Sequence, residues 1–422
     1  MTTPISARRL AVAAFLAGAL ALAGAVALSR AGAGVAAPPA ASTPASIAMG
    51  SKPMAGMAMP LASTPRPMAM ASPTPQSMSM PGMTTGTSGA ARPYHVAFAR
   101  ALPYRVLVTD MGMDDMNAMV PGTTSGMMAM EAHAGVRLLF GPLLHTGSMP
   151  HGVDVMPGGR YAFVSNFMAD PGTAVQIDLH AFRIVRRYRV GINPTHFVFS
   201  PDRRYAFVDD FGSSDVYRLD LATGRATRIG FPRDDCLRTH GNALSPDGHT
   251  LYVACASEAW IYTIDTRTLR PVSHAITGIG PYDVKIDGPR HELWVSNQLG
   301  DSVTVLDERS LRTLATIGLG KGMTPSLLAL TPDGRRAYVG DLKGNAVSVI
   351  DTASRRVIAT VPVAAQPFGP TVTPDGRYVY EPSIKGSVVT IIRVADNRVM
   401  AVVPAPVGAL HVAIAPPLSM SM

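Results

Sequence analysis

Methionine and histidine are the residues of this 422-residue chain whose clustering suggests chemistry. Residues 111–130 read MGMDDMNAMVPGTTSGMMAM, and seven of these twenty residues are methionine. The run also holds Asp114, Asp115 and Pro121, so its composition is not that of a core segment. Methionine usually fills gaps in cores, but its thioether is also a soft ligand that selects Cu(I). Which role applies depends on where the fold places this run.

A regular repeat organises the chain from about residue 150 onward. Six turns related to SPDG each follow one short alternating strand and precede another, and their prolines are 44, 45, 43, 43 and 42 residues apart. These prolines are Pro157, Pro201, Pro246, Pro289, Pro332 and Pro374. Four short strands per unit of about forty residues is the periodicity of a β-propeller. We therefore predict an all-β fold.

The two ends of the repeat region predict a seventh blade. GALHVAIAPP (408–417) matches a first strand and stops where the next turn would begin, while LPYRVLVTDMG (102–112) matches a second strand. Residues 126–133 and 136–141 then match the third and fourth strands. Pairing the two ends closes the ring and removes exposed sheet edges. HVAFA (95–99) is left without a place.

One face of the predicted propeller collects the unusual side chains. The loops that lead into first strands, and the loops between second and third strands, share this face. It should hold histidines at equivalent positions of four consecutive blades, a further histidine in the loop before His151, and the methionine-rich run. The candidate metal ligands are His145, His151, His196, His240, His411, Met111, Met113 and Met116. Imidazole suits copper and zinc, so copper is the expected metal. A histidine at such a rim can instead simply hydrogen-bond a neighbouring blade.

The acidic and sulfur-bearing residues of this face have simpler interpretations. Asp209 and Asp210 could ligate Ca²⁺, but we expect solvated loop acids. Cys236 and Cys255 are the two cysteines of the chain. In an oxidising compartment such a pair predicts one disulfide, and it would stiffen the rim near His240.

Two family resemblances follow from these motifs. The strands after SPDG turns, together with VSVIDTASRRVIATVPV, resemble the YVTN-repeat β-propellers over residues 95–417. GPLLHTGSMPHGV (141–153) is similar to segments of nitrous oxide reductase, whose propeller binds a copper–sulfide cluster through histidines; cytochrome d1 propellers are of the same kind. That resemblance implies copper ligation by His145 and His151 and, by position, by His196, His240 and His411. The chain lacks that family's downstream cupredoxin domain, and methionine stands where its paired histidines would be. The resemblance to nitrous oxide reductase therefore implies a shared site location rather than a shared reaction.

The N-terminal region predicts export. Arg8 and Arg9 precede an apolar stretch, and small residues follow it, so residues 1–33 have the features of a signal peptide, or else of an uncleaved anchor. Residues 34–92 form a linker rich in Met, Pro and Ala, with nine methionines between 49 and 83. Such a composition cannot bury a core. The domain plan is a signal (1–33), a linker (34–92), a seven-bladed propeller (93–417) and a tail (418–422), in a periplasmic or secreted monomer.

Composition and motifs exclude several function classes. The net charge of +8 comes from scattered arginines, whereas a nucleic-acid-binding surface needs a clustered basic patch. The sequence has no C-x-x-C-H haem motif, no P-loop and no G-x-S-x-G motif.

Three hypotheses remain. The first is a copper-binding protein for copper handling or tolerance, working with a periplasmic partner. The second is an oxidoreductase with a copper or haem-like cofactor. The third is a metal-free scaffold for a protein or ligand.

Overall fold

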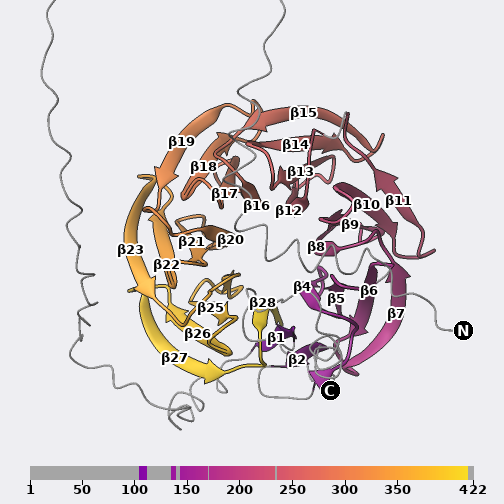
Figure 1. Cartoon of the computed structure of the whole chain (residues 1–422), viewed down its shortest axis with the longest axis horizontal. Helices are drawn as coiled ribbons and strands as arrows, with labels where there is room; N and C mark the ends of the chain where they lie inside the picture. Colours follow the sequence, from indigo (N-terminus) through magenta and orange to yellow (C-terminus); the bar gives the residue numbers. More distant parts are fainter. Residues whose placement is uncertain (1–103, 112–134, 139–142, 170, 233–234, 417–422) are drawn as a thin grey trace, which may run out of the picture. The chain divides into compact units, whose positions relative to one another are not determined.

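The computed structural model describes residues 104–111, 135–138, 143–169, 171–232 and 235–416. Within these ranges the chain forms seven four-stranded antiparallel sheets arranged as blades around a central channel (Figure 1). This confirms the predicted all-β, seven-bladed propeller. The described residues include no helix long and apolar enough to span a membrane. The predicted signal, linker and tail, and residues 95–99, lie outside the described ranges.

Each blade has its first strand at the channel and its fourth at the rim. Blade 1 contains β4 (Pro150–Val155), β5 (Tyr161–Asn166), β6 (Thr173–Asp178) and β7 (Arg183–Arg189). Blade 2 contains β8 (Pro194–Phe199), β9 (Tyr205–Asp210), β10 (Asp215–Asp220) and β11 (Ala226–Ile229). Blade 3 contains β12 (Thr239–Leu244), β13 (Thr250–Cys255), β14 (Trp260–Asp265) and β15 (Arg270–Ile276). Blade 4 contains β16 (Pro281–Asp287), β17 (Glu292–Asn297), β18 (Ser302–Asp307) and β19 (Thr313–Gly318). Blade 5 contains β20 (Pro325–Leu330), β21 (Arg336–Asp341), β22 (Ala346–Asp351) and β23 (Arg356–Pro362). Blade 6 contains β24 (Thr371–Val372), β25 (Tyr378–Ser383), β26 (Val388–Arg393) and β27 (Arg398–Pro404).

Blade 7 closes the ring with strands from both ends of the repeat region. It contains β28 (Ala409–Ala415), β1 (Arg105–Asp110), β2 (Gly135–Leu138) and β3 (Leu143–Leu144), in that order across the sheet. The pairing of β28 with β1 confirms the predicted closure. The predicted third and fourth strands were placed too early: residues 135–138 form the third, and 143–144 the fourth. The likeness of GMMAMEAH to a strand misled the assignment, because alternation alone does not set register.

Burial follows the position of each strand in its blade. The second strand of blade 1, YAFVSN, is almost wholly buried, because neighbouring blades pack on both of its faces. The outer strand β7, RIVRRYR, alternates between exposed and partly buried residues, because one of its faces meets solvent. The SPDG turns close the strands on the opposite side of the ring from the histidines. In one of them Asp202 accepts hydrogen bonds from the Ser200 hydroxyl and the Arg204 amide.

Candidate metal centre

The four channel histidines occupy two levels along the first strands, not one. The pairing of first with second strands aligns Pro150, Pro194, Thr239 and Ala409. His151 and His240 therefore stand one residue into their strands, whereas His196 and His411 stand two residues in. The sequence prediction of equivalent positions was wrong in this respect. A one-residue offset between neighbouring blades lets four rings share the narrow channel instead of colliding at one height.

Glycines at the deeper level make room for the neighbouring blade's side chain. A Cβ placed on Gly152 would lie 2.3 Å from the Thr195 carbonyl oxygen and 3.1 Å from Nδ1 of His196. A Cβ on Gly369 would lie 3.0 Å from Cδ2 of His411. The alternation of a ring on one blade with a glycine on the next therefore sets where the imidazoles stand.

The substitution Gly152→Ala tests this packing. We expect it to lower the free energy of unfolding by about 1–3 kcal/mol, because the added methyl meets backbone that cannot move away. Chemical denaturation measures the loss. Gly288→Ala is the matched control, because a Cβ there has nothing within 4 Å. Equal losses of unfolding free energy for Gly152→Ala and Gly288→Ala would show that a methyl group at Gly152 meets no crowding.

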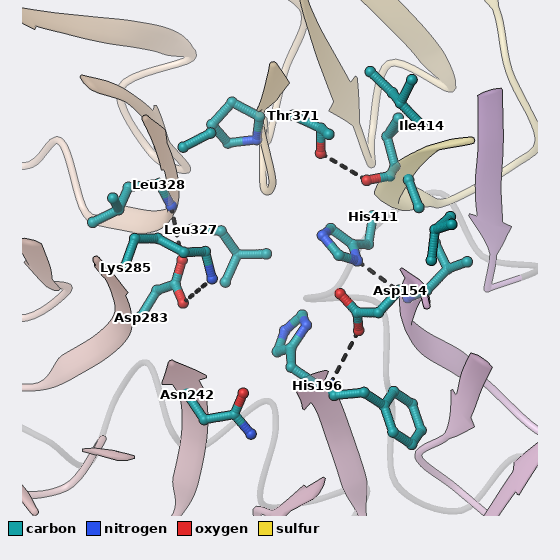
Figure 2. A pocket seen from close by; sticks show the side chains of 17 residues that line it. Asp154, His196, Asn242, Asp283, Lys285, Leu327, Leu328, Thr371, His411 and Ile414 are labelled. Carbon is teal, nitrogen blue, oxygen red and sulfur yellow. Dashed lines mark hydrogen bonds and ion pairs between the residues drawn. The ribbon is translucent and has the colours of Figure 1, made fainter. Parts of the chain in front are cut away.

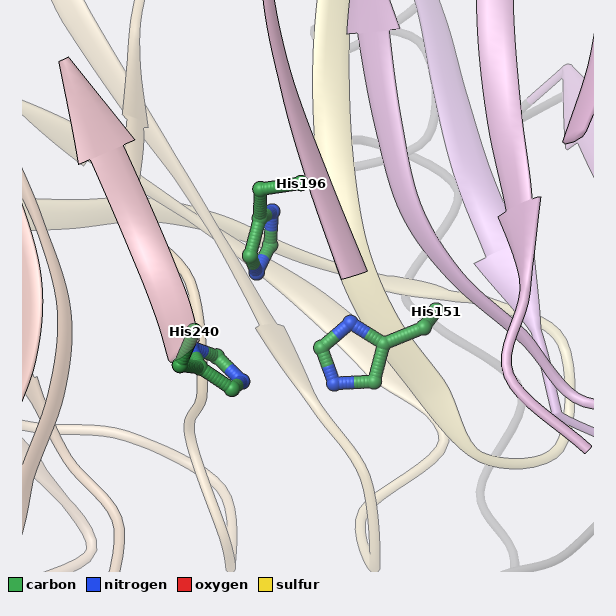
Figure 3. Close-up of side chains that lie close together, drawn as sticks. All are labelled: His151, His196 and His240. Carbon is green, nitrogen blue, oxygen red and sulfur yellow. The ribbon is translucent and has the colours of Figure 1, made fainter. Parts of the chain in front are cut away.

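Three of the histidines form a triangle at the centre of the ring. The ring centroids of His151, His196 and His240 are 5.1, 5.2 and 5.1 Å apart, with the rings steeply inclined to one another (Figure 3). One nitrogen from each ring lies within 4.8 Å of the other two. Nδ1 of His151, Nε2 of His196 and Nε2 of His240 are buried and have no hydrogen-bond partner in the described part of the chain. We call these three residues the histidine triad.

The protonation state of the triad suits metal binding. Burial lowers the pKa of His151 to about 3 and the pKa values of His196 and His240 well below the usual value, so all three rings are neutral at pH 7. Nδ1 of His240 lies 3.2 Å from the Tyr282 carbonyl oxygen. A carbonyl can only accept, so Nδ1 carries the proton and Nε2 keeps its lone pair. This is the outer-shell bond that fixes the tautomer of many metal-binding histidines.

The spacing is compatible with a metal ion. Bonds of about 2.0–2.1 Å to three imidazoles place their nitrogens about 3.5 Å apart. Nitrogens within 4.8 Å reach that spacing by small rotations of the rings. The unpartnered buried nitrogens also indicate a bound metal ion, because buried polar atoms seldom lack a partner.

His411 faces a different environment. Its Nδ1 accepts a hydrogen bond of 3.1 Å from the Val153 amide. In the neutral ring the proton is therefore on Nε2, which can donate but cannot ligate a metal as an ordinary imidazole. One ring nitrogen each of His411 and His196 and one oxygen of Asp154 also lie within 4.8 Å of one another. They form a second group of possible metal ligands, and this group includes a carboxylate. His145 is exposed and belongs to neither group.

The methionines and acids of this face differ from expectation. Met111 is fully buried in an apolar cluster with Met149, Phe167 and Phe368, so it is a core residue of this face, contrary to its sequence interpretation. Phe167 stacks on His151 with 5.3 Å between centroids. The cluster therefore shields the triad with apolar surface. Met113 and Met116 lie outside the described residues.

Asp209 and Asp210 are also buried rather than solvated. Asp210 accepts hydrogen bonds from the Ile192 and Asn193 amides. Neither carboxylate oxygen of Asp209 has a hydrogen-bond partner of normal geometry in the described residues, and burial raises its pKa well above the usual value, although Asn242 nearby partly offsets the rise.

A cavity of about 280 Å³ lies beside the triad and shares His196 with it (Figure 2). Polar side chains from four blades reach it: Asp154, Asn242, Asp283, Lys285 and His411. Sequence reasoning found His411 but missed Asp154, Asn242, Asp283 and Lys285. All of them lie on first strands, and that position was the signal available for finding them.

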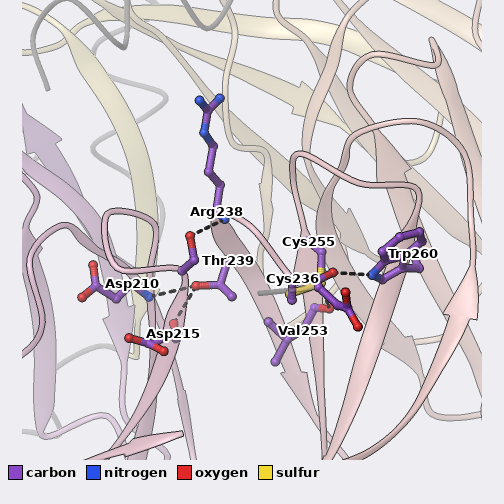
Figure 4. The surroundings of a disulfide bond; sticks show 10 residues. Asp210, Asp215, Cys236, Arg238, Thr239, Val253, Cys255 and Trp260 are labelled. Carbon is purple, nitrogen blue, oxygen red and sulfur yellow. Dashed lines mark hydrogen bonds between the residues drawn. A yellow bond between two sulfur atoms is a disulfide. The ribbon is translucent and has the colours of Figure 1, made fainter. Parts of the chain in front are cut away.

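A disulfide joins Cys236 to Cys255 beside the third blade's first strand (Figure 4). Cys255 pairs with Thr239, which directly precedes His240. The Thr239 hydroxyl donates to the Asp215 carbonyl and accepts from the Asp210 amide, tying blade 3 to blade 2. The disulfide and these hydrogen bonds therefore anchor the start of β12, which carries His240 of the triad.

Removing the disulfide should be costly. Closing a loop with a sequence separation of 19 stabilises the fold by about 3 kcal/mol through the entropy of the unfolded chain. We expect Cys236→Ser/Cys255→Ser to lower the free energy of unfolding by that amount. Wild type in reductant should match the double variant, whose own stability should not respond to reductant. If reductant also lowered the stability of the double variant, the loss seen in the wild type could not be assigned to the disulfide.

Comparisons with known proteins agree with the fold. No family model matches the chain. A seven-bladed beta-propeller protein of Mycobacterium tuberculosis is 38% identical over 108 residues, which are 24% of this chain and 26% of that protein. The match thus spans about a quarter of that relative. Hydrazine synthase of Kuenenia stuttgartiensis is a structural neighbour with a TM-score of 0.56 and 22% identity, covering 62% of this chain and 88% of that one. At that identity the likeness is one of fold alone.

Proposed function

We propose that this protein is an exported propeller that binds copper through the histidine triad and serves copper handling or tolerance. The observation that carries the proposal is the convergence of three buried, neutral imidazoles, each with an unpartnered nitrogen, from three consecutive blades. A rigid ring of blades holds such ligands in place before the metal arrives.

Copper is favoured over other metals by the donor set and its surroundings. Imidazole binds zinc, iron, nickel and copper, and among the divalent ions copper binds most tightly. The triad contains no carboxylate, and the apolar cluster covers it. A monovalent ion costs less to bury than a divalent one, so the site suits Cu(I). Residues 49–83 and 112–130 add nine and six of the chain's 24 methionines, a soft-ligand supply outside the triad.

Metal analysis of the full chain tests this proposal. The exported protein, purified without a histidine tag, should carry about one copper per chain by mass spectrometry. A His151→Ala/His196→Ala/His240→Ala variant should carry none, and a variant lacking residues 34–92 should retain it. Copper lost only with residues 34–92 would place the metal on the linker, and a chain that takes up zinc but not Cu(I) would contradict the identity of the metal. N-terminal sequencing of the exported protein tests cleavage within residues 1–33.

An oxidoreductase is the second candidate, and one observation favours it. The cavity shares His196 with the triad, so a bound molecule would lie beside the metal. Reversible oxidation and reduction of the copper-loaded protein, with a shift in its absorption when a cavity ligand is added, would support catalysis over handling. A redox-silent protein that releases Cu(I) to an acceptor would support handling.

A further inference from the structure

The cavity beside the triad has its own donors and acceptors, contributed by residues outside the triad. Lys285 projects into it from β16, His411 from β28, Asp154 from β4 and Asn242 from β12 (Figure 2). Four separate strands thus present polar groups to one cavity. Convergence of this kind on an otherwise apolar wall is typical of small-molecule sites.

Two of these groups are fixed as hydrogen-bond donors. The Lys285 ammonium is held 2.7 Å from Oδ1 of Asp283, and Asp283 is fully buried. The Asp283 oxygens also accept from the Val284 and Leu328 amides, so this carboxylate is committed to the wall. The remaining ammonium hydrogens face the cavity. His411 adds Nε2–H, because the Val153 amide occupies its Nδ1.

Two other groups are acceptors, Asp154 and Asn242, and one oxygen of Asp154 lies within 4.8 Å of a ring nitrogen of His411. One oxygen of Asp154 accepts from the Phe197 amide at 3.1 Å. Among the described residues Lys285 forms its ion pair with Asp283 and not with Asp154. Figure 2 shows the amide oxygen of Asn242 on the cavity side, while its Nδ2 is buried and has no hydrogen-bond partner in the described residues.

We infer that this cavity binds a small α-hydroxy or α-amino carboxylate. Its carboxylate would lie on Lys285 and His411, and its hydroxyl or amino group on Asp154 and Asn242. The donors Lys285 and His411 match the carboxylate. One oxygen of Asp154 lies within 4.8 Å of a His411 ring nitrogen, so an acceptor stands where a group on the neighbouring carbon would lie. The apolar walls are left for a short side chain. The volume of about 280 Å³ limits the ligand to a few carbons. This inference goes beyond copper binding, because none of the four contacting residues belongs to the triad.

Calorimetric titration of the full chain with L-lactate, L-alanine and propionate tests the inference. Propionate keeps the carboxylate but lacks the second group, so we expect lactate, alanine or both to bind at least tenfold more tightly than propionate. Lactate above alanine would identify a hydroxy acid, and the reverse order an amino acid. Equal binding of all three, or no binding, would overturn the inference.

Variants localise the binding. Lys285→Met should weaken the tighter ligand at least tenfold, and Asp154→Asn should bring its affinity down toward that of propionate. Because Lys285→Met leaves Asp283 buried without its cation, Lys285→Met/Asp283→Asn provides a second version, and thermal melting verifies that each variant is folded. Unchanged binding in both lysine variants would overturn the inference. His274→Ala, at an exposed position of the outer strand β15, should bind the ligand as wild type does. Titration of the metal-free full chain keeps this result independent of the outcome for copper.

Discussion

His196→Ala should weaken Cu(I) binding by at least about a hundredfold, since loss of an outer-shell partner alone already costs 10–100-fold. His196 supplies one of the three unpartnered nitrogens, and its ring is 5.1 Å from both His240 and His411. Two remaining imidazoles cannot close the triangle. Competition with a chromogenic Cu(I) chelator measures the affinity of the full chain and of the variant.

Two other histidines serve as controls for this result. His274→Ala changes an exposed residue of the outer strand β15 and should leave the affinity unchanged. His411→Ala is the sharper control, because His411 is close to His196 but has its Nδ1 occupied by the Val153 amide. We expect its affinity to stay within about threefold of wild type, since it removes no metal ligand. A loss as large as that of His196→Ala would mean that the metal lies between Asp154, His196 and His411, and the triad assignment would be wrong.

Glu381→Gln should stabilise the protein, increasingly so as the pH rises. Glu381 is fully buried on β25, and neither of its carboxylate oxygens has a hydrogen-bond partner of normal geometry in the described residues. Burial raises its pKa well above the usual value, although the nearby Phe368 and Gly369 amides partly offset the rise. The folded protein therefore keeps the proton while the unfolded chain releases it above about pH 4.5. The wild type loses up to about 1.4 kcal/mol of unfolding free energy per pH unit between the unfolded and folded pKa values. Glutamine has nothing to ionise, so the variant avoids this loss.

Urea denaturation at pH 5, 6 and 7 measures the effect as a widening gap between variant and wild type. Glu292→Gln is the matched substitution at another buried glutamate. Glu292 pairs with Arg355 at 2.6 Å and accepts from the Trp294 indole, so this change should destabilise the fold. A constant gap for Glu381→Gln across the three pH values would mean that Glu381 is ionised in the folded protein.

Much of the fold could be predicted because blade periodicity is a local property. Turn prolines at regular spacing and alternating strands between them depend on neighbours a few residues apart, and the structure confirms both. The closure of blade 7 was also predictable, because the unpaired first strand at one end matched three unpaired strands at the other. The boundaries of β2 and β3 were not, because two short strands after a long methionine-rich stretch of sequence have no turn signal to set their register.

The site was predicted in its members but not in its arrangement. That His151, His196, His240 and His411 face the channel follows from their place at the start of first strands. Which of them form a triangle depends on a one-residue offset between blades and on the glycines that permit it. The exclusion of His411 depends on a single amide, that of Val153, which belongs to another blade.

The sequence by itself determined the propeller, its closure and the histidine-bearing face, because these follow from periodicity and from alternation along each strand. The tertiary structure alone decided that Met111 and Asp209 are buried, that Lys285 and Asp154 share a cavity with His411, and that three imidazoles meet. Those facts come from contacts between residues of different blades. Their distances are set by how blades pack around the ring, which no local pattern encodes.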